Sequence, residues 1–365
     1  MNEYDFAVAG AGPAGGLFAL LAARSGYRVL LAERSSFDKP RFGETAPPEL
    51  RATLTHVGLG HLGRAPYASD APELLSVWGV DQPASRNHIF SPHGSALHLD
   101  RPAFDEALAF AARDAGADLR AGCALRFAPR SNEGYLVQLP NGESVHARLA
   151  ILATGRSGGR LGLPYVRRHL DDHVGLAAQF SSSGKTFDQR TLVEAVPGGW
   201  FYLAALSSGT AAVLFVTSAR LVPSGRDPRL RWWLEALART KLVRTALEGC
   251  RIPRTVSVID ARAANASAAG GENWLAIGDA RIAPDPLAGQ GLHWAMDDAI
   301  GVIELLKRLT WREVVRQMQA RTERDIECYQ IDRQRAYSME RRFESDAYWQ
   351  IAQSLPVGRR ARHLA

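Results

Sequence analysis

One stretch of sequence decides the fold: Asp5-Phe6-Ala7-Val8-Ala9-Gly10-Ala11-Gly12-Pro13-Ala14-Gly15. Its apolar residues up to Ala9 are typical of a buried parallel strand, and leucines at helical spacing resume at Leu17. The glycines therefore stand at a strand-to-helix turn, where their spacing admits a pyrophosphate at the N-terminus of a helix. We expect a dinucleotide to be bound by Gly10, Ala11, Gly12, Pro13, Ala14 and Gly15.

A second strand is predicted over 27–32, and it ends at Glu33, 18 residues after Gly15. In a strand–helix–strand unit that binds a dinucleotide, an acid at the end of the second strand hydrogen-bonds the hydroxyls of a ribose. Strand and helix alternate to about residue 80. Strand-like segments then dominate the middle of the chain, at 174–181, 190–196, 200–206, 211–217 and 255–259, with one helical stretch at 228–248. Further strand-like segments at 75–80 and 89–99 surround the turn Pro92-His93-Gly94, and a long helix is expected from Gly289.

Length and composition favour a two-domain enzyme, since 365 residues exceed what one core usually supports. The sequence contains no apolar run long enough to span a membrane, and we expect a cytoplasmic protein. Its three cysteines, Cys123, Cys250 and Cys328, have neither metal-ligand spacing nor an even number, which argues against a disulfide framework and a metal site. The net charge of +6 comes almost wholly from arginine. We expect no nucleic-acid partner, although the charge could favour an acidic substrate or partner.

A second segment far along the chain narrows the choice of dinucleotide. Ala276-Ile277-Gly278-Asp279-Ala280 is followed by Asp285-Pro286-Leu287-Ala288-Gly289-Gln290-Gly291. Together with Arg101 on a predicted helix and Ala153-Thr154-Gly155 after a strand, this order resembles the flavin-dependent aromatic monooxygenases and halogenases, across roughly 310 residues.

The resemblance implies FAD, with Asp279 on the ribityl chain and Arg101 near the pyrophosphate. It also implies that the helix opened by Pro286 to Gly291 faces the pyrimidine end of the flavin. A helix N-terminus stabilises an anion by a few tenths to about 1 kcal/mol, which suits a reduced flavin. Beyond the first loop, the expected cofactor contacts are Glu33, Arg34, Arg41, Thr45, Arg101, Ala153, Thr154, Gly155, Gly278, Asp279, Pro286, Gly289, Gln290, Gly291 and Leu292.

The implied fold is α/β of the hydroxybenzoate-hydroxylase type: a Rossmann-like FAD-binding domain, an interleaved β-sheet substrate domain and C-terminal helices. We expect the FAD-binding domain to comprise 1–75, 95–165 and 268–310. The β-rich substrate domain would comprise 76–94 and 166–267, and 311–365 would form the helical C-terminal segment.

Arg41-Phe42-Gly43-Glu44-Thr45 resembles the Gly-Glu-Ser loop of halogenase-type flavoproteins. Halogenases carry a lysine some tens of residues beyond this loop, which captures hypohalous acid, but no lysine occurs between Lys39 and Lys185. Their Trp-x-Trp-x-Ile-Pro stretch is also altered, to Trp200-Phe201-Tyr202-Leu203-Ala204-Ala205. The resemblance therefore implies direct oxygen transfer from a flavin C4a-hydroperoxide to an electron-rich ring, with O2 as co-substrate. Because the segment after Ala153 departs from hydroxylases reduced by NADPH, electrons could come from NAD(P)H directly or through a separate flavin reductase.

Further short motifs, among them Ser76-Val77-Trp78-Gly79 and Glu340-Arg341-Arg342-Phe343, resemble one subgroup. Its members mature lysine-ε-oxidase and glycine oxidase by hydroxylating a tryptophan of the partner toward cysteine tryptophylquinone. The substrate is then a protein that bears a tryptophan, or else an aromatic small molecule. A halogenase or halogenase-like tailoring enzyme, a geranylgeranyl-reductase-like flavin dehydrogenase and a non-catalytic FAD-binding partner remain alternatives.

Candidate catalytic residues follow from where these motifs would lie. His93 and His98 could take the proton of an indole or phenol as the ring is attacked. Glu44 could orient the substrate or the flavin. An aromatic substrate could stack on Trp200, Tyr202 or Trp294.

Overall fold

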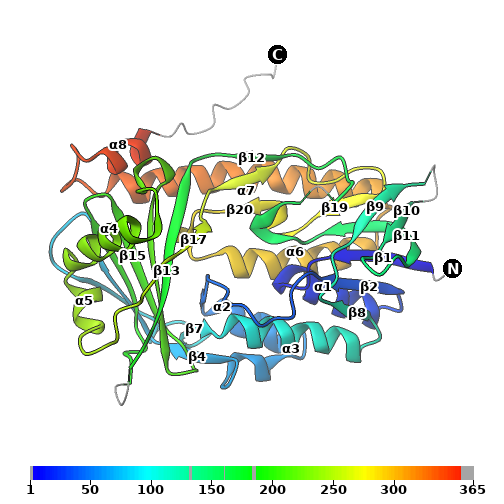
Figure 1. Cartoon of the computed structure of the whole chain (residues 1–365). Coiled ribbons are helices and arrows are strands. Elements are labelled where there is room, and N and C mark those ends of the chain that lie inside the picture. The colour runs from blue at the N-terminus through cyan, green and yellow to red at the C-terminus, as the bar shows by residue number, and fades with distance from the viewer. Residues whose placement is uncertain (1–2, 131–133, 160, 183–185, 355–365) are drawn as a thin grey trace.

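The computed structural model describes residues 3–130, 134–159, 161–182 and 186–354. The molecule has the expected α/β architecture, built on two seven-stranded sheets that lie at opposite ends (Figure 1). The C-terminal helix α7 (Trp311–Ser338) runs along one side of both ends. The first sheet, which contains the strand before the glycine turn, and the second sheet therefore lie on opposite sides of the middle of the molecule.

The first sheet has the strand order β8-β2-β1-β11-β10-β9, with β19 beside β11. Its strands are β1 (Glu3–Ala9), β2 (Val29–Glu33), β8 (Asp118–Ala121), β9 (Arg126–Pro129), β10 (Tyr135–Gln138), β11 (Ser144–Leu152) and β19 (Trp274–Ala276). Strand β1 is parallel to both β2 and β11, and β19 joins β11 in parallel from late in the chain. One face is covered by α1 (Pro13–Arg24), α3 (Arg101–Asp114) and α6 (Gly291–Leu306).

The turn from β1 to α1 explains the glycine spacing. Gly10 has φ +104°, and a Cβ there would lie 2.3 Å from the carbonyl oxygen of Ala153. A Cβ on Gly15 would lie 1.9 Å from the carbonyl oxygen of Gly10. The strand, turn and helix predicted for this stretch are confirmed, and both glycines are required by close packing.

The second sheet has the order β17-β13-β16-β15-β14-β5-β6. Its strands are β5 (Glu73–Val77), β6 (Ala84–Asn87), β13 (His173–Ser181), β14 (Thr191–Val196), β15 (Gly199–Ala205), β16 (Thr210–Ser218) and β17 (Ser257–Asp260). Side chains alternate between its two faces, as the period of a strand requires. Phe201 and Leu203 pack against Trp233 of helix α4 (Arg226–Ala238), which covers the outer face of the sheet. Trp200 and Tyr202 point to the opposite face, toward the interior of the molecule.

Two predicted segments differ in detail from the structure. The helical stretch 228–248 is two helices, α4 (Arg226–Ala238) and α5 (Leu242–Ala246), because the buried carboxylate of Glu194 accepts the N–H groups that open α5. Of the strand-like segment 89–99 around the predicted turn Pro92-His93-Gly94, only the part after the turn forms a strand, β7 (Ala96–Leu99). The residues before it form turns, in which Ser91 N–H bonds the carbonyl of His88 and Gly94 N–H bonds that of Ser91.

Two small three-stranded sheets join the larger ones. They contain β3 (Thr45–Ala46), β4 (Ala68–Ala71) and β7, and β12 (Arg167–His169), β18 (Ala264–Ala266) and β20 (Ile282–Ala283). The remaining helices are α2 (Glu49–His56) and α8 (Ala347–Ser354), with short 3-10 helices at Gly60–Gly63, Gly155–Ser157, Ala219–Leu221, Gly278–Ala280 and Pro286–Ala288. Strand β5 begins inside the segment predicted to bind FAD, although it belongs to the second sheet; the domain division otherwise stays a prediction. Of the predicted C-terminal segment, 355–365 lies outside the described residues.

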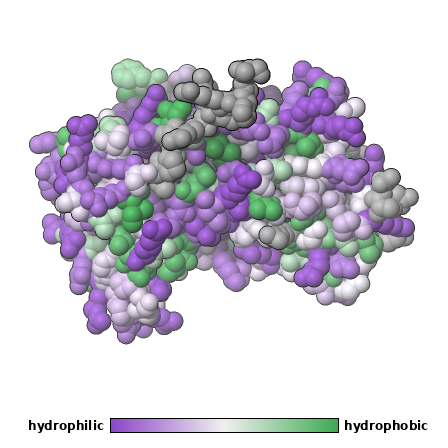
Figure 2. All heavy atoms as spheres, turned by 90° about the horizontal axis from the view of Figure 1, so that it is seen from above, coloured by the Kyte–Doolittle hydropathy of each residue, from purple (hydrophilic) through white to green (hydrophobic). Residues whose placement is uncertain are grey.

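The face seen in Figure 2 is mostly hydrophilic, and hydrophobic side chains emerge on it in small patches. Among the described helices, none combines the length and the apolar content that crossing a membrane requires.

Candidate active site

A cavity of about 1700 Å³ lies between the first sheet, the N-terminus of α6 and the inner face of the second sheet. Common ligand pockets measure roughly 300–1,000 Å³, so this cavity has room for a dinucleotide and a second molecule. Of the predicted cofactor contacts, those that line it are Gly10, Gly12, Pro13, Ala14, Glu33, Arg34, Arg41, Thr45, Arg101, Ala153, Thr154, Gly155, Asp279, Pro286, Gly289, Gln290, Gly291 and Leu292. Ala11, Gly15 and Gly278 lie behind this wall.

Glu33 ends β2 at the cavity wall. Its Oε2 accepts a hydrogen bond from Ala11 N–H at 3.0 Å, and its Oε1 accepts from Ser35 and from Arg41. Burial alone would raise the pKa of Glu33, but the charge of Arg41 and the N–H donors outweigh burial and lower it. The carboxylate is therefore ionised and held in place, as a grip on ribose hydroxyls requires.

Two arginines at the cavity wall share one buried carboxylate as an ion-pair partner. Asp105, which is fully buried on α3, accepts from Arg41 Nη1 at 2.6 Å and from Arg101 Nη2 at 3.1 Å. Arg101 also donates from Nη1 to the carbonyl of Gly43 at 3.0 Å. Both guanidinium groups are thereby fixed beside the glycine turn, where pyrophosphate oxygens would need them. Sequence reasoning missed the role of Asp105, although its spacing of four from Arg101 on a helix was a signal.

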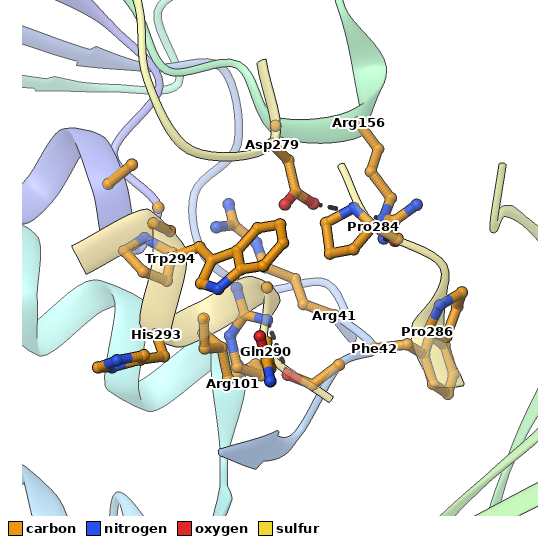
Figure 3. A pocket seen from close by; sticks show the side chains of 18 of the residues that line it. Arg41, Phe42, Arg101, Arg156, Asp279, Pro284, Pro286, Gln290, His293 and Trp294 are labelled. Atoms are coloured by element: carbon orange, nitrogen blue, oxygen red, sulfur yellow. Dashed lines mark hydrogen bonds and ion pairs between the residues drawn. The ribbon is translucent and has the colours of Figure 1, made fainter. Parts of the chain in front are cut away.

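Asp279 sits on the opposite wall. Its Oδ2 lies 3.3 Å from Nε of Arg156, and both side chains are partly exposed to the cavity (Figure 3). Arg156 is anchored in turn, since its Nη1 donates to the carbonyl of Arg262 at 2.9 Å. Arg156 was also missed, because it follows Ala153-Thr154-Gly155 without any motif of its own.

The residues present fit FAD. Nothing blocks a close approach to Gly12, since the nearest heavy atom to a Cβ there is Arg41 Nη1 at 4.0 Å. The Thr154 hydroxyl is buried without a hydrogen-bond partner among the described residues, which leaves a polar atom for a ligand to satisfy. Glu33 would hold the ribose, the arginine pair the pyrophosphate and Asp279 the ribityl chain.

The loop before α6 is anchored by Asp285. Its Oδ1 accepts from Leu287 N–H at 2.7 Å and so caps the short helix from Pro286. Its Oδ2 accepts from the Tyr337 hydroxyl at 2.6 Å and lies 3.2 Å from Nδ1 of His173. Burial alone would raise the pKa of Asp285, but His173 and Arg333 lower it to about 2.

Asp171, His173 and Asp285 bring three potential ligand atoms within 4.8 Å of one another. A metal ion is not needed to balance their charge, because the guanidinium of Arg333 lies 3.6 Å from each of the two carboxylates. We therefore interpret the group as a buried ion cluster that joins β13 and α7 to the loop before α6, which is expected to lie beside the flavin. No local sequence pattern predicts this cluster.

The second half of the cavity is walled by the inner face of the second sheet. Thr45 lines the cavity, and its hydroxyl lies 2.6 Å from the hydroxyl of Tyr202, which also lines it. The carboxyl of Glu44 is 1% exposed, its Oε2 accepts from Gly43 N–H at 3.0 Å, and its Oε1 has no partner among the described residues. Burial raises the pKa of Glu44 to about 7. The paired hydroxyls of Thr45 and Tyr202 thus lie at the cavity wall, close to a buried acid that can change its protonation near neutral pH.

The two candidate histidines are placed differently from each other. His98 is buried on β7 and reaches the cavity only through Thr191, whose Oγ1 lies 2.7 Å from its Nε2. Burial lowers the pKa of His98 to about 4, so the ring is neutral. His93 is exposed in the turn before β7 and does not line the cavity, contrary to the expectation that it faces the ligand. Trp200 and Trp294 both line the cavity, and Trp200 Nε1 donates to Tyr337 at 3.1 Å.

This fold and this site define a flavoprotein with a dinucleotide cleft beneath a sheet-walled substrate cavity. Residues 79–363 match the model of the tryptophan halogenase family, and the chain belongs to this family. LodB of Marinomonas mediterranea, which is named as an FAD-dependent oxidoreductase, is 27% identical over 359 residues, or 96% of this chain and 97% of LodB.

Two solved structures share the fold. The myxobacterial chondrochloren halogenase CndH, an FAD-dependent halogenase, superposes with a TM-score of 0.84 at 21% identity, over 97% of this chain and 86% of CndH. The peptidyl tryptophan dihydroxylase QhpG, essential for tryptophylquinone cofactor biogenesis, has a TM-score of 0.78 at 25% identity, over 100% of this chain and 81% of QhpG. The chain is thus similar both to halogenases and to an enzyme that oxygenates tryptophan in a peptide.

Proposed function

We propose that this chain is an FAD-dependent monooxygenase that adds oxygen to an electron-rich aromatic ring, the side chain of a tryptophan in a partner polypeptide. Likeness to LodB over nearly the whole length of both chains supports this function, as does likeness to QhpG. The observation that carries it is the cavity wall beyond Thr45, where the buried acid Glu44 stands behind two hydroxyls.

That wall favours oxygenation over halogenation. Among the described residues that line the cavity, Lys39 is the only lysine, and it belongs to the loop that carries Arg41 to Glu33. The substrate half of the cavity is instead walled by Thr45, Tyr202 and Trp200. An ammonium that could capture hypohalous acid is therefore missing from the described substrate half.

When bound and reduced, FAD would supply the two electrons that activate O2, and O2 would supply the oxygen atom that is transferred. The residues of this chain bind and orient. Tyr202 offers its ring to an indole, and Trp200, whose side chain is almost fully buried, supports the wall beside it. Electrons would come from NAD(P)H directly or through a separate flavin reductase.

The paired hydroxyls of Thr45 and Tyr202 can accept the proton that the ring loses. Burial and the charge of Glu44 hold the pKa of Tyr202 well above its usual value, so its hydroxyl stays protonated beside Thr45. A proton received at Thr45 Oγ1 can pass to the Tyr202 hydroxyl, which lies 2.6 Å away, and we assign its final uptake to the nearby carboxylate of Glu44. Glu44 with a pKa of about 7 is matched to this task, because a general base works best near the operating pH.

Mass spectrometry with labelled oxygen tests the proposal. Protein loaded with chemically reduced FAD is exposed to ¹⁸O2 in the presence of bromide and of a peptide that contains one tryptophan. We expect the label on the indole of the peptide and no brominated product, and we expect Glu44→Gln to reduce labelling about a hundredfold. Glu304→Gln, an exposed change on α6, is the matched control. Brominated peptide, or reoxidation without labelled peptide, would refute the proposed function.

A further inference from the structure

The second sheet ends in an unpaired edge next to the cavity. Strand β6 pairs only with β5, in antiparallel register, and no other strand of the described chain lies beside it. All four of its residues, Ala84–Asn87, are exposed. An unpaired strand edge is a template on which another extended chain can add.

The direction of the free backbone groups follows from one hydrogen bond. His88 N–H donates to the carbonyl of Pro72 at 2.9 Å, just beyond the register that pairs Leu74 with Arg86. Because an antiparallel ladder alternates, the backbone groups of Arg86 point toward β5, whereas those of Ser85 and Asn87 point away from the sheet. This edge therefore presents N–H and C=O groups to a further strand.

The edge is continuous with the cavity. Arg86, Leu74 and Thr191 are register partners across β6, β5 and β14, and all three line the cavity. They form one row of side chains that leads from the free edge to the wall on which Tyr202 lies. A side chain carried by a strand at the edge would face the mouth of the cavity.

Charge and apolar surface gather at the same place. None of the ion pairs found among the described residues involves Arg86, although its exposed guanidinium lines the cavity. Beyond β6, Ile89 is 76% exposed and Phe90 is 95% exposed, and they are flanked by His88 and Ser91 of the cavity wall. Exposed apolar side chains at a rim are typical of an interaction site.

We propose that β6 is the docking site for the partner polypeptide. An extended segment of that partner pairs with the outward backbone groups of Ser85 and Asn87 and places an acidic side chain against Arg86. The segment also packs an apolar side chain on Ile89 and Phe90, and a tryptophan of the same segment enters the cavity. This inference rests on the proposed function, whose substrate it specifies as an extended acidic segment.

Two substitutions at one position isolate the backbone pairing. Both Ser85→Pro and Ser85→Ala remove the hydroxyl that contacts Glu73, but only proline removes the outward N–H. Proline is tolerated on an edge strand when its N–H is not used in the ladder. The probe is a labelled peptide of alternating aspartate and valine with one central tryptophan, tested on the full-length FAD-loaded protein.

We expect Ser85→Pro to weaken binding of this peptide at least tenfold, while Ser85→Ala binds as the unchanged protein does. N-methylation of alternate backbone nitrogens of the peptide should weaken binding similarly. The Arg86→Glu variant should no longer bind the aspartate peptide, and it should bind a peptide in which lysine replaces each aspartate. Equal binding by the two Ser85 variants, or no binding of the aspartate peptide to the unchanged protein, would overturn the docking site.

The outcome separates this inference from the proposed function. A peptide that is hydroxylated equally by the unchanged protein and by Ser85→Pro refutes docking at β6 alone. A peptide that binds through β6 but is never oxygenated refutes the proposed function alone.

Discussion

Nδ1 of His173, on the second sheet, lies 3.2 Å from Oδ2 of Asp285, in the loop that leads to α6. Both side chains are buried, and the hydroxyl of Tyr337 on α7 reaches the same carboxylate oxygen. One carboxylate therefore connects the wall of the substrate cavity, the C-terminal helix and the loop expected beside the flavin. The geometry of this loop depends on contacts from parts of the chain that carry no cofactor motif.

His173→Asn should destabilise the fold by about 3 kcal/mol, because it removes the imidazole contact of the buried Asp285 carboxylate. Urea unfolding at pH 7 measures this effect, and His93→Asn at an exposed position is the control. The folded pKa of Asp285, about 2, lies below the ordinary value, so its stabilising contribution is present above about pH 4 and is lost as the pH falls toward 2. In the variant, the free energy of unfolding should therefore not show this decrease between about pH 4 and pH 2. Unfolding curves that coincide with those of His93→Asn would contradict the cluster's role.

Asp279→Ala should weaken retention of FAD about 10- to 100-fold, because the ribityl hydroxyls lose a charged acceptor. The fold should survive, since the pair of Asp279 with Arg156 is partly exposed. The ratio of flavin absorbance to protein after gel filtration measures the effect. Asp332→Ala, an exposed change on α7, provides the comparison. Full occupancy in Asp279→Ala would remove this residue from the cofactor site.

Gly12→Ala and Gly15→Ala should separate binding of the cofactor from folding. A Cβ on Gly12 meets open space, and its φ of −74° suits alanine, so that variant should fold normally and yet bind FAD weakly. A Cβ on Gly15 would overlap the carbonyl oxygen of Gly10, so the second variant should lose several kcal/mol of stability. Thermal unfolding of both apoproteins distinguishes them. Normal binding by Gly12→Ala would show that the dinucleotide does not approach this turn.

The rate of oxygenation should rise with pH and level off above about pH 7, because Glu44 must be ionised to accept a proton. Below pH 7 the carboxyl is protonated, and the rate should fall about tenfold per pH unit. Glu44→Gln should give a low rate that does not follow this limb. Single-turnover rates between about pH 5 and pH 9 test the assignment, and a variant that keeps the limb would place the base elsewhere.

The cofactor half of the site could be predicted because each of its groups belongs to a local pattern. Gly10 and Gly15 mark a turn by spacing, and Glu33 ends the next strand at a fixed distance along the chain. Asp279 and the helix start at Gly291 lie within one short motif. Such signals depend only on neighbours in sequence, so the structure preserves them.

The rest of the site depends on contacts between distant segments. Asp105 was visible only as a helical neighbour of Arg101, and neither Arg156 nor Arg333 stands in any motif. The turn at Pro92-His93-Gly94 could be predicted, but His93 was placed toward the ligand because the insertion around it was expected to face the cavity. His98, a few residues later, is buried because β7 pairs with both β3 and β4. The difference depends on tertiary pairing, for which the local sequence carries no signal.

The first sheet is completed by β19, which joins β11 only from late in the chain. During synthesis, β1, α1 and Glu33 leave the ribosome long before Asp279 and the start of α6 have been translated. The nascent protein therefore carries half of a cleft through most of its elongation and can capture its prosthetic group only near the end. A message cut short before the codons of β19 would yield a chain that has the glycine turn but cannot close around its ligand.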